Sequence, residues 1–166
     1  MYRNSALFAA LFGALLVVAG CDQAGNTAAS AGDDVDILSG IESSQDFGDY
    51  ELHFNALGTN QLTPEIAQEY GIVRNPNRVM LTLSILDTSG GGIGTAVSGS
   101  VEASAVNLTG QLKNIPVREI NEGDAIYYIG ETTVVDSESL VFTVAVTPAD
   151  EPDPLTVRFQ KQFFVD

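Results

Sequence analysis

His53 is the only histidine in the chain, and it lies between two polar residues at the spacing of a strand face. Glu51 precedes it by two residues and Asn55 follows it by two, so in an extended segment these three side chains would line one face at about 7 Å intervals. A histidine beside a carboxylate can act as a general base. One hypothesis is therefore a hydrolase that uses carboxylates near His53.

The rest of the chain does not complete a catalytic set around His53. Nucleophilic catalysis needs a serine, cysteine or threonine next to a histidine base, and no serine here stands in a nucleophile-elbow pattern. A single histidine on the polar face of a strand is more often a hydrogen-bonded surface residue. We therefore predict that the protein is not an enzyme, assign no catalytic residue, and interpret Glu51, His53 and Asn55 as a candidate binding surface.

Two arginines extend this candidate surface. Arg74 and Arg78 are four residues apart around the turn Arg74-Asn75-Pro76-Asn77. Arginine suits bidentate pairing with carboxylates, so each could fix a turn or a strand end against an Asp or Glu. The sharper hypothesis is that the two arginines together bind a carboxylate group of a ligand.

Metal ligands are scarce. One histidine and one cysteine, Cys21, leave too few nitrogen or sulfur donors for zinc. Asp150, Glu151 and Asp153 could chelate calcium in a loop, although prolines and plain solvation explain that segment more simply. We predict no metal and no cofactor, and leave the calcium question for residues 150–153 open.

The elements that would position these residues are mostly strands. Tyr50, Leu52, Phe54 and Ala56 alternate with the polar residues above, which is the period of a half-buried strand. Thr63 is a plausible helix N-cap with Pro64 after it and Gly71 as the stop. Alternation predicts further strands at about residues 79–86, 96–106, 111–119, 125–135, 139–147 and 155–165.

Seven strands with turn residues between them and no βαβ rhythm predict an all-β fold. The expected form is an antiparallel, seven-stranded immunoglobulin-like β-sandwich with one short helix after the first strand, and a small barrel is the alternative. The adjacent residues Tyr127 and Tyr128 must point to opposite faces, so one of them could be exposed at a binding surface.

The first residues form an export signal. Arg3 gives a positive start, Ala6 to Val18 is an apolar run too short to span a bilayer, and small residues precede Cys21. Val18-Ala19-Gly20-Cys21 resembles the lipobox of bacterial lipoproteins. The resemblance implies cleavage before Cys21, a diacylglyceryl group on its thiol and usually acylation of the new amino terminus. Asp22 resembles the signal that retains lipoproteins in the inner membrane, so we lean towards that membrane.

Composition then divides the chain into three parts. With the lipobox resemblance, we expect residues 1–20 to be the lipoprotein signal peptide, residues 21–44 a lipidated, flexible and acidic linker, and residues 45–166 the β-sandwich domain. The formal charge falls from −15 to −16 without residues 1–20, because Arg3 is the only charged side chain there. Nucleic acid is excluded as a partner because it requires clustered positive charge.

Several stretches of the domain resemble an uncharacterised domain-of-unknown-function family of small exported proteins from Gram-negative bacteria. The stretches are His53-Phe54-Asn55-Ala56, Leu62-Thr63-Pro64-Glu65-Ile66-Ala67, Tyr70-Gly71-Ile72-Val73-Arg74, Arg118-Glu119-Ile120 and Phe159-Gln160-Lys161-Gln162-Phe163-Phe164. The resemblance covers nearly the whole domain and implies export, but it brings no activity, cofactor or catalytic residue.

These observations favour a membrane-tethered, periplasmic binding or interaction module that is not catalytic. Its partners would be the membrane, through the lipid at Cys21, and a protein or small ligand. The alternatives are the envelope hydrolase using carboxylates near His53, or an assembly factor of an envelope complex.

Overall fold

The computed structural model describes residues 36–38, 43–149 and 151–165. Cys21, most of the predicted linker and Asp150 lie outside the described residues. No helix in the described part of the chain is both long and apolar enough to cross a membrane.

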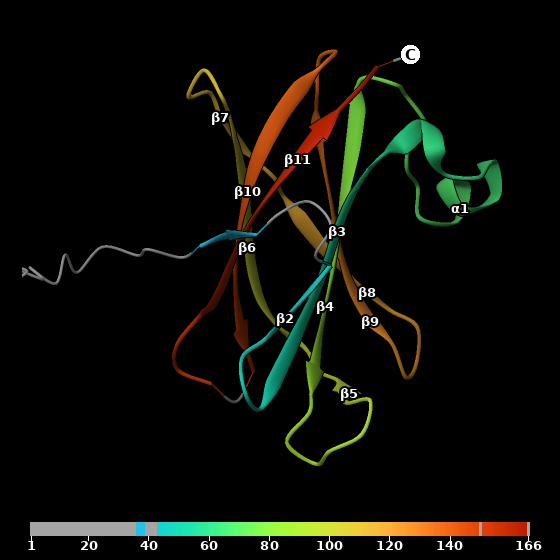
Figure 1. Ribbon diagram of the computed structural model, residues 1–166. Coiled ribbons are helices and arrows are strands. Elements are labelled where there is room, and N and C mark those ends of the chain that lie inside the picture. Colours follow the sequence, from blue (N-terminus) through green and yellow to red (C-terminus); the bar gives the residue numbers. More distant parts are fainter. Residues whose placement is uncertain (1–35, 39–42, 150, 166) are drawn as a thin grey trace, which may run out of the picture. The chain divides into compact units, whose positions relative to one another are not determined.

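The described residues form two β-sheets that pack face to face (Figure 1). One sheet has five strands in the order β1 (Ile37–Leu38), β11 (Leu155–Phe163), β10 (Glu138–Pro148), β6 (Gly99–Asn107) and β7 (Leu112–Asn114). The other has β2 (Ser44–Asp46), β3 (Tyr50–Gly58), β4 (Arg78–Asp87), β9 (Ile126–Thr133) and β8 (Val117–Asn121), with β5 (Thr95–Ala96) paired to β4.

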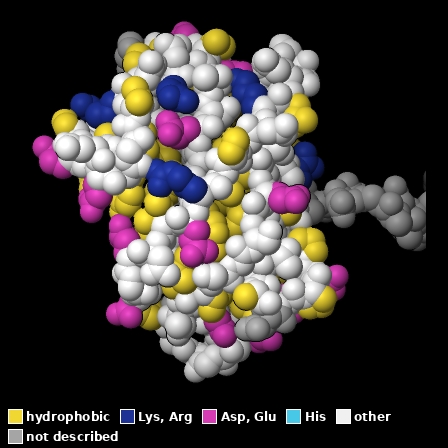
Figure 2. Space-filling model, turned by 180° about the vertical axis from the view of Figure 1, so that it is seen from behind, with side chains coloured by type: hydrophobic (Ala, Val, Ile, Leu, Met, Phe, Trp, Pro, Cys, Tyr) yellow, Lys and Arg dark blue, Asp and Glu magenta, His cyan; other side chains and the backbone are white. Residues whose placement is uncertain are grey.

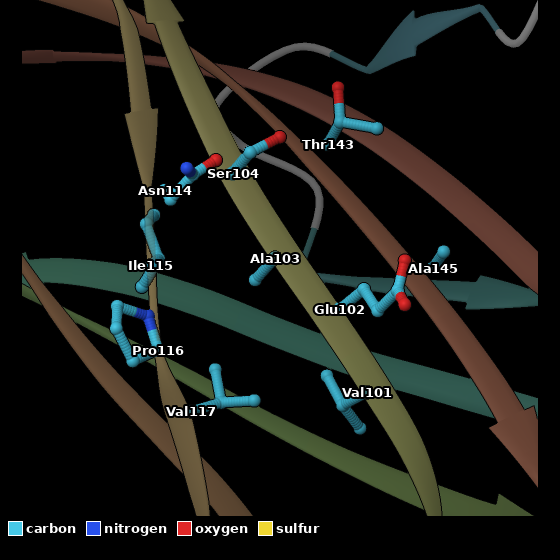
Figure 3. Close-up of a pocket in the computed structure, with 10 residues that line it drawn as sticks. All are labelled: Val101, Glu102, Ala103, Ser104, Asn114, Ile115, Pro116, Val117, Thr143 and Ala145. Atoms are coloured by element: carbon cyan, nitrogen blue, oxygen red, sulfur yellow. The ribbon is translucent and has the colours of Figure 1, made fainter.

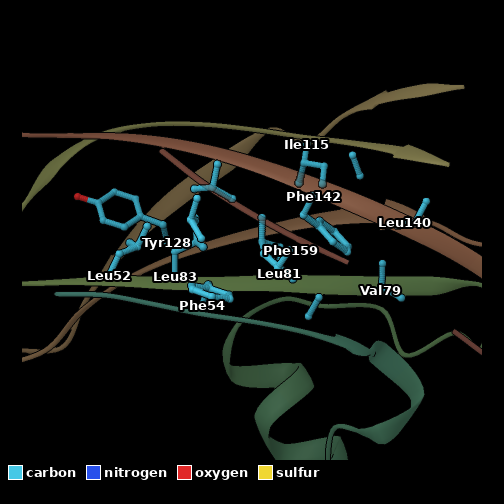
Figure 4. Packing of buried hydrophobic residues seen from close by; sticks show 14 of the residues in the cluster. Leu52, Phe54, Val79, Leu81, Leu83, Ile115, Tyr128, Leu140, Phe142 and Phe159 are labelled. Carbon is cyan, nitrogen blue, oxygen red and sulfur yellow. The ribbon is translucent and has the colours of Figure 1, made fainter. Parts of the chain in front are cut away.

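Alternation along the long strands places one apolar face of each sheet in a shared core. The inward residues of β3, β4 and β10 are at most 3 % exposed, as predicted: Leu52, Phe54, Ala56, Val79, Leu81, Leu83, Ile85, Leu140, Phe142, Val144 and Val146. In the centre of the core the rings of Phe54, Phe159 and Phe142 stack in sequence, with centroids 4.7 and 4.8 Å apart (Figure 4). Because Phe54 comes from β3 and the other two from the opposite sheet, this stack joins the two layers.

The short helix forms where its capping residues predict it. A 3-10 turn, η1 (Thr59–Gln61), precedes α1 (Pro64–Glu69). The Thr63 hydroxyl accepts a hydrogen bond from the Ile66 N–H at 3.3 Å, and Pro64 occupies the first turn. Gly71 follows the helix with φ of +63°, a backbone conformation that favours glycine.

The single strand predicted at residues 111–119 is wrong. The structure splits it into β7, which pairs with β6, and β8, which pairs with β9 in the other sheet. Pro116 lies between them, and proline interrupts a strand because it lacks an N–H. The all-β sandwich is confirmed, whereas the seven-stranded immunoglobulin-like arrangement is not, because the described residues form eleven strand segments.

The amino-terminal strands join both sheets. Ile37 and Leu38 pair in parallel with Arg158 and Phe159 of β11, and Ser44 to Asp46 pair antiparallel with β3. Ile37, Leu38 and Ser44 fall within residues 21–44, the range predicted to be linker.

Gly130 is required where the chain crosses from one sheet to the other. A Cβ atom on Gly130 would lie 2.6 Å from the Ile115 Cγ2 and 3.0 Å from the Pro116 carbonyl oxygen. Gly130→Ala is therefore expected to lower the free energy of unfolding by about 1–3 kcal/mol, because a well-packed core accommodates extra atoms only by strain. Urea denaturation would measure the loss, with Gly90→Ala as control because no atom lies within 4 Å there. An equal effect of the two substitutions would contradict this account.

Candidate binding groove

The outward face of the six-stranded sheet carries the residues predicted as a binding surface. Glu51, His53 and Asn55 project from β3 on the side away from the core, since Leu52 and Phe54 between them are buried. His53 lies directly opposite Ser84 of β4, and Asn55 lies opposite Thr82.

One half of this outward face is covered by α1 and the loop after it. Ala67 and Ile72 pack there on Met80 of β4 and Ile129 of β9, and all four are at most 6 % exposed. Two hydrogen bonds hold this covering segment against β8 and the turn after it. Arg118 donates to the Tyr70 carbonyl oxygen, and the Tyr70 hydroxyl donates to Glu122 at 2.8 Å. The bond to Glu122 raises the pKa of Tyr70 to about 12.

The other half of the face is open and hollowed. A shallow hollow of about 500 Å³ is lined by His53, Asn55, Thr82, Ser84, Leu86 and Tyr127, together with Ser43 and parts of Phe54 and Leu83. A second hollow of about 560 Å³ continues from it towards the β4–β5 loop and shares Ser84, Leu86 and Tyr127. We call the two together the outer groove.

Tyr127 and Tyr128 separate as the alternation predicts. Tyr128 is 4 % exposed, and its hydroxyl donates to Glu119 at 2.9 Å and accepts from the Gly99 N–H at 2.7 Å. Burial raises the pKa of Tyr128, and the bond to Glu119 adds to that effect. Tyr127 points outward into the outer groove, where its ring forms part of an apolar floor with Leu86.

His53 has one acidic neighbour and an incomplete set of hydrogen bonds. Its Nε2 lies 3.5 Å from the Glu51 Oε2, a distance that gives an ion pair only when the ring is protonated. That nitrogen is shielded from solvent and has no hydrogen-bond partner, while the side chain as a whole is 44 % exposed. His53 thus lies at the edge of the outer groove with one ring nitrogen shielded and without a hydrogen-bond partner.

Asn55 is held from the other sheet. Its Oδ1 accepts a hydrogen bond from the Lys161 Nζ of β11 at 3.3 Å, and burial lowers the pKa of Lys161. Glu51, His53 and Asn55 are therefore neighbours on one strand, as predicted, but their contacts lead to different partners.

Arg74 and Arg78 lie apart from the outer groove. The Arg74 guanidinium donates to the Asn60 carbonyl oxygen at 2.9 Å, and the Arg78 Nε lies 3.8 Å from the Glu131 Oε2. In this arrangement each arginine fastens a turn or a strand end. The joint carboxylate site of the two arginines stays a hypothesis.

No group of three His, Cys, Asp or Glu side chains in the described ranges is close enough to hold a metal ion. Asp150, Glu151 and Asp153 belong to the loop that could chelate calcium. Glu151 and Asp153 are exposed, and Asp150 lies outside the described ranges.

A family model, described as a domain of unknown function, DUF4426, matches residues 44–166. The chain belongs to the DUF4426 family. A DUF4426 family protein of known structure from Pseudomonas aeruginosa PAO1 is 31 % identical, with a TM-score of 0.64 over 74 % of this chain and 94 % of that one. No curated protein matches the sequence.

More distant structures share the fold of this DUF4426 domain. FetP of uropathogenic Escherichia coli strain F11, expressed recombinantly in the periplasm, is 14 % identical with a TM-score of 0.54 over 73 % of this chain and 92 % of FetP. A copper-bound variant of FetP is 13 % identical with a TM-score of 0.53, over 74 % and 90 % of the two chains.

Several residues of the outer groove were not predicted as site residues. Ser84 and Leu86 belong to an alternating strand, and Ile93 lies in the Gly90–Gly94 loop with 93 % of its surface exposed. A signal for them exists in the sequence, because Met80 and Leu86 are apolar residues on the otherwise polar face of β4. Such residues indicate that the DUF4426 sheet is partly covered on its outside.

Proposed function

We propose that this DUF4426 domain is a non-catalytic binding or interaction module of the bacterial envelope, which holds a ligand in the outer groove. The main support is that α1 covers only half of the outward face of the six-stranded sheet. The other half stays open around His53, Ser84 and Tyr127. The lipobox residues ending at Cys21 support a lipid anchor and a periplasmic position. Asp22 supports the inner membrane, and the periplasmic expression of FetP is compatible with this compartment.

The lining of the outer groove defines the kind of ligand. Leu86 and Tyr127 offer an apolar floor, Ser84 and His53 offer hydrogen-bonding atoms, and the carboxylates of Glu51 and Asp124 lie at its borders. A chain with a formal charge of −15 attracts cations. The expected ligand is a small molecule or a protein segment with an apolar body and a positive or hydrogen-bond-donating edge.

Copper is not part of this proposal, although the FetP variant is copper-bound. Copper sites are built mainly from histidine, cysteine and methionine donors. Here His53 is the only histidine, and no metal-sized cluster of His, Cys, Asp or Glu occurs in the part of the chain that the structure describes. The residues present therefore do not fit a FetP-like metal site.

The geometry also favours binding over hydrolysis. A serine nucleophile must lie within about 2.6–3.2 Å of its histidine base. Ser84 faces His53 across the two strands, yet the buried His53 Nε2 has no hydrogen-bond partner. The hydrolase alternative would require a rearrangement of His53. The assembly-factor alternative differs from the proposal only in having one stoichiometric protein partner.

Photo-crosslinking in intact cells tests the proposal. A crosslinking amino acid at Ser84 is expected to capture one dominant adduct, whereas the same probe at Gln160, exposed on the other sheet, is expected to capture none of it. The Cys21→Ser variant is expected to be absent from the membrane fraction. If the Ser84 crosslink requires the lipid anchor, this variant is expected to lose it. The same products at Ser84 and Gln160, or an activity that disappears in His53→Ala, would overturn the proposal.

A further inference from the structure

Part of one edge of β6 is left without a neighbouring strand in the described residues. β10 pairs with β6 along its whole length, from Gly99 to Asn107. On the opposite side β7 pairs only with Ser104 to Val106, because the chain then crosses at Ile115 and Pro116 to the other sheet. In the described residues no strand pairs with Gly99–Ala103 on this side, and we call that stretch the free edge of β6.

Val101 presents its backbone polar groups to the free edge. Successive residues of a strand direct their N–H and C=O groups to alternate sides. The carbonyl of Ser98 accepts from Ala149 beside β10, whereas the carbonyl of Ala103 accepts from Ile115 on the other side. Odd-numbered residues of β6 therefore face the free edge, where the Gly99 N–H is taken by the Tyr128 hydroxyl and Val101 comes next.

A groove of about 490 Å³ lies over β6 and includes this edge; on its other side it reaches Thr143 and Ala145 of β10 (Figure 3). Val101 and Ala103 line it from β6, and Ile115, Pro116 and Val117 line it from the crossing segment, so this part is apolar. Glu102 projects from the outward side of β6 and is exposed. In the view from behind, apolar side chains gather in the middle of the domain, and both acidic and basic side chains lie around them (Figure 2).

We infer that the free edge of β6 accepts an extended segment of a partner protein as an added β-strand. Unpaired edge groups of a strand are satisfied by another strand, and alternate side chains of that strand then read the pockets beside it. Opposite Val101 and Ala103 the segment would carry small apolar side chains. Its outward residue beside Glu102 would be lysine or arginine, since opposite charges stabilise cross-strand pairs.

A second copy of the chain suits this edge poorly. Two copies could pair their β6 edges antiparallel, centred on Val101 or on Glu102. In either case the two Glu102 carboxylates would lie on the same face as cross-strand or diagonal neighbours, and their repulsion would destabilise the pair. Each copy also has a formal charge of −15. Both facts favour a basic segment from a different protein.

A synthetic peptide tests the inference on the purified full chain. The probe is a fluorescein-labelled heptapeptide in which valine alternates with lysine, and its binding is followed by fluorescence anisotropy. Hydrogen exchange of backbone amides is expected to slow at Val101 and Ala103 when the peptide is present. The same peptide with N-methylated valines is expected not to bind, because it cannot complete the backbone pairing.

Two charge reversals separate strand addition from general attraction. Glu102→Lys is expected to weaken binding of the valine–lysine peptide about fivefold, the effect of about 1 kcal/mol from one cross-strand charge pair, and to favour a valine–glutamate peptide instead. Glu69→Lys changes the net charge equally at the exposed end of α1, which packs on the other sheet, and is expected to change the affinity little.

The inference would be overturned by absence of binding, by equal binding of the N-methylated peptide, or by equal weakening by the two charge reversals. Slower hydrogen exchange at His53 and Tyr127, with none at Val101, would assign the peptide to the outer groove. That result would also overturn the edge site but leave the proposed binding function standing.

Discussion

Phe142→Ala is expected to lower the free energy of unfolding by about 3–5 kcal/mol, the cost of removing a buried aromatic side chain. Phe142 is fully buried, and its ring stacks on Phe159 at 4.8 Å and meets the edge of Phe163 at 6.2 Å. Phe159 in turn stacks on Phe54 of the other sheet, so loss of the Phe142 ring leaves a cavity beside this contact that backbone movement fills only in part. Urea denaturation monitored by circular dichroism would measure the change.

Phe164→Ala is the matched control. Phe164 lies one residue beyond β11 and is 66 % exposed, so its removal is expected to cost less than about 0.5 kcal/mol. A loss below about 1 kcal/mol for Phe142→Ala would contradict the importance assigned to the Phe142 ring in the core.

Lys113→Met is expected to cost about 3 kcal/mol, because it leaves a buried carboxylate without its countercharge. The Lys113 Nζ lies 2.8 Å from both Glu138 carboxylate oxygens and donates to the Thr133 carbonyl oxygen, also at 2.8 Å. The side chains of Lys113 and Glu138 are only 12 % and 7 % exposed. The pair joins β7 to the start of β10, near the point where the chain changes sheets.

Two further variants make this prediction specific. Lys161→Met removes another partly buried lysine, which donates to the Asn55 amide oxygen, and is expected to cost less than about 1 kcal/mol. The double variant Lys113→Met with Glu138→Leu is expected to be more stable than Lys113→Met alone, since no buried charge remains. A double variant less stable than the single one would contradict the explanation.

The ion pair of Lys113 with Glu138 also predicts that the free energy of unfolding depends on pH. Burial by itself raises the pKa of Glu138, but hydrogen bonds from Lys113, Asn107 and the Val135 N–H outweigh it and hold the pKa below its ordinary value of 4.5. A carboxylate with a lowered pKa in the folded state stabilises the fold above its unfolded pKa. That stability is lost as the pH falls through the folded pKa. The difference in unfolding free energy between the wild type and Glu138→Gln should therefore narrow below pH 4.5.

The sequence predicts those elements whose signals are local. Val79, Leu81, Leu83 and Ile85 show the alternation of β4, and the Thr63-Pro64 pair with Gly71 marks both ends of α1. In each case the determining contacts lie within a few residues along the chain, or depend only on which side of a strand is buried.

Features that depend on distant partners could not be predicted in the same way. The change of sheet at Pro116 depends on Gly130, which makes room for the crossing segment. The pairing of Lys113 with Glu138 joins residues that no local pattern relates. Of the candidate site, Glu51, His53 and Asn55 could be placed on one face, but the cover by α1 that delimits the outer groove required the packing of Ile72 on Met80 and Ile129.

The parallel pairing of β1 with β11 has a consequence for the order in which the five-stranded sheet forms. Ile37 and Leu38 are synthesised long before their partners Arg158 and Phe159, because most of the domain lies between them in the sequence. Contacts between such distant parts of a chain form late because loop closure must come first. The five-stranded sheet therefore stays incomplete until β11 has been made, and a chain that stops before β11 would leave that side of β10 without a partner strand.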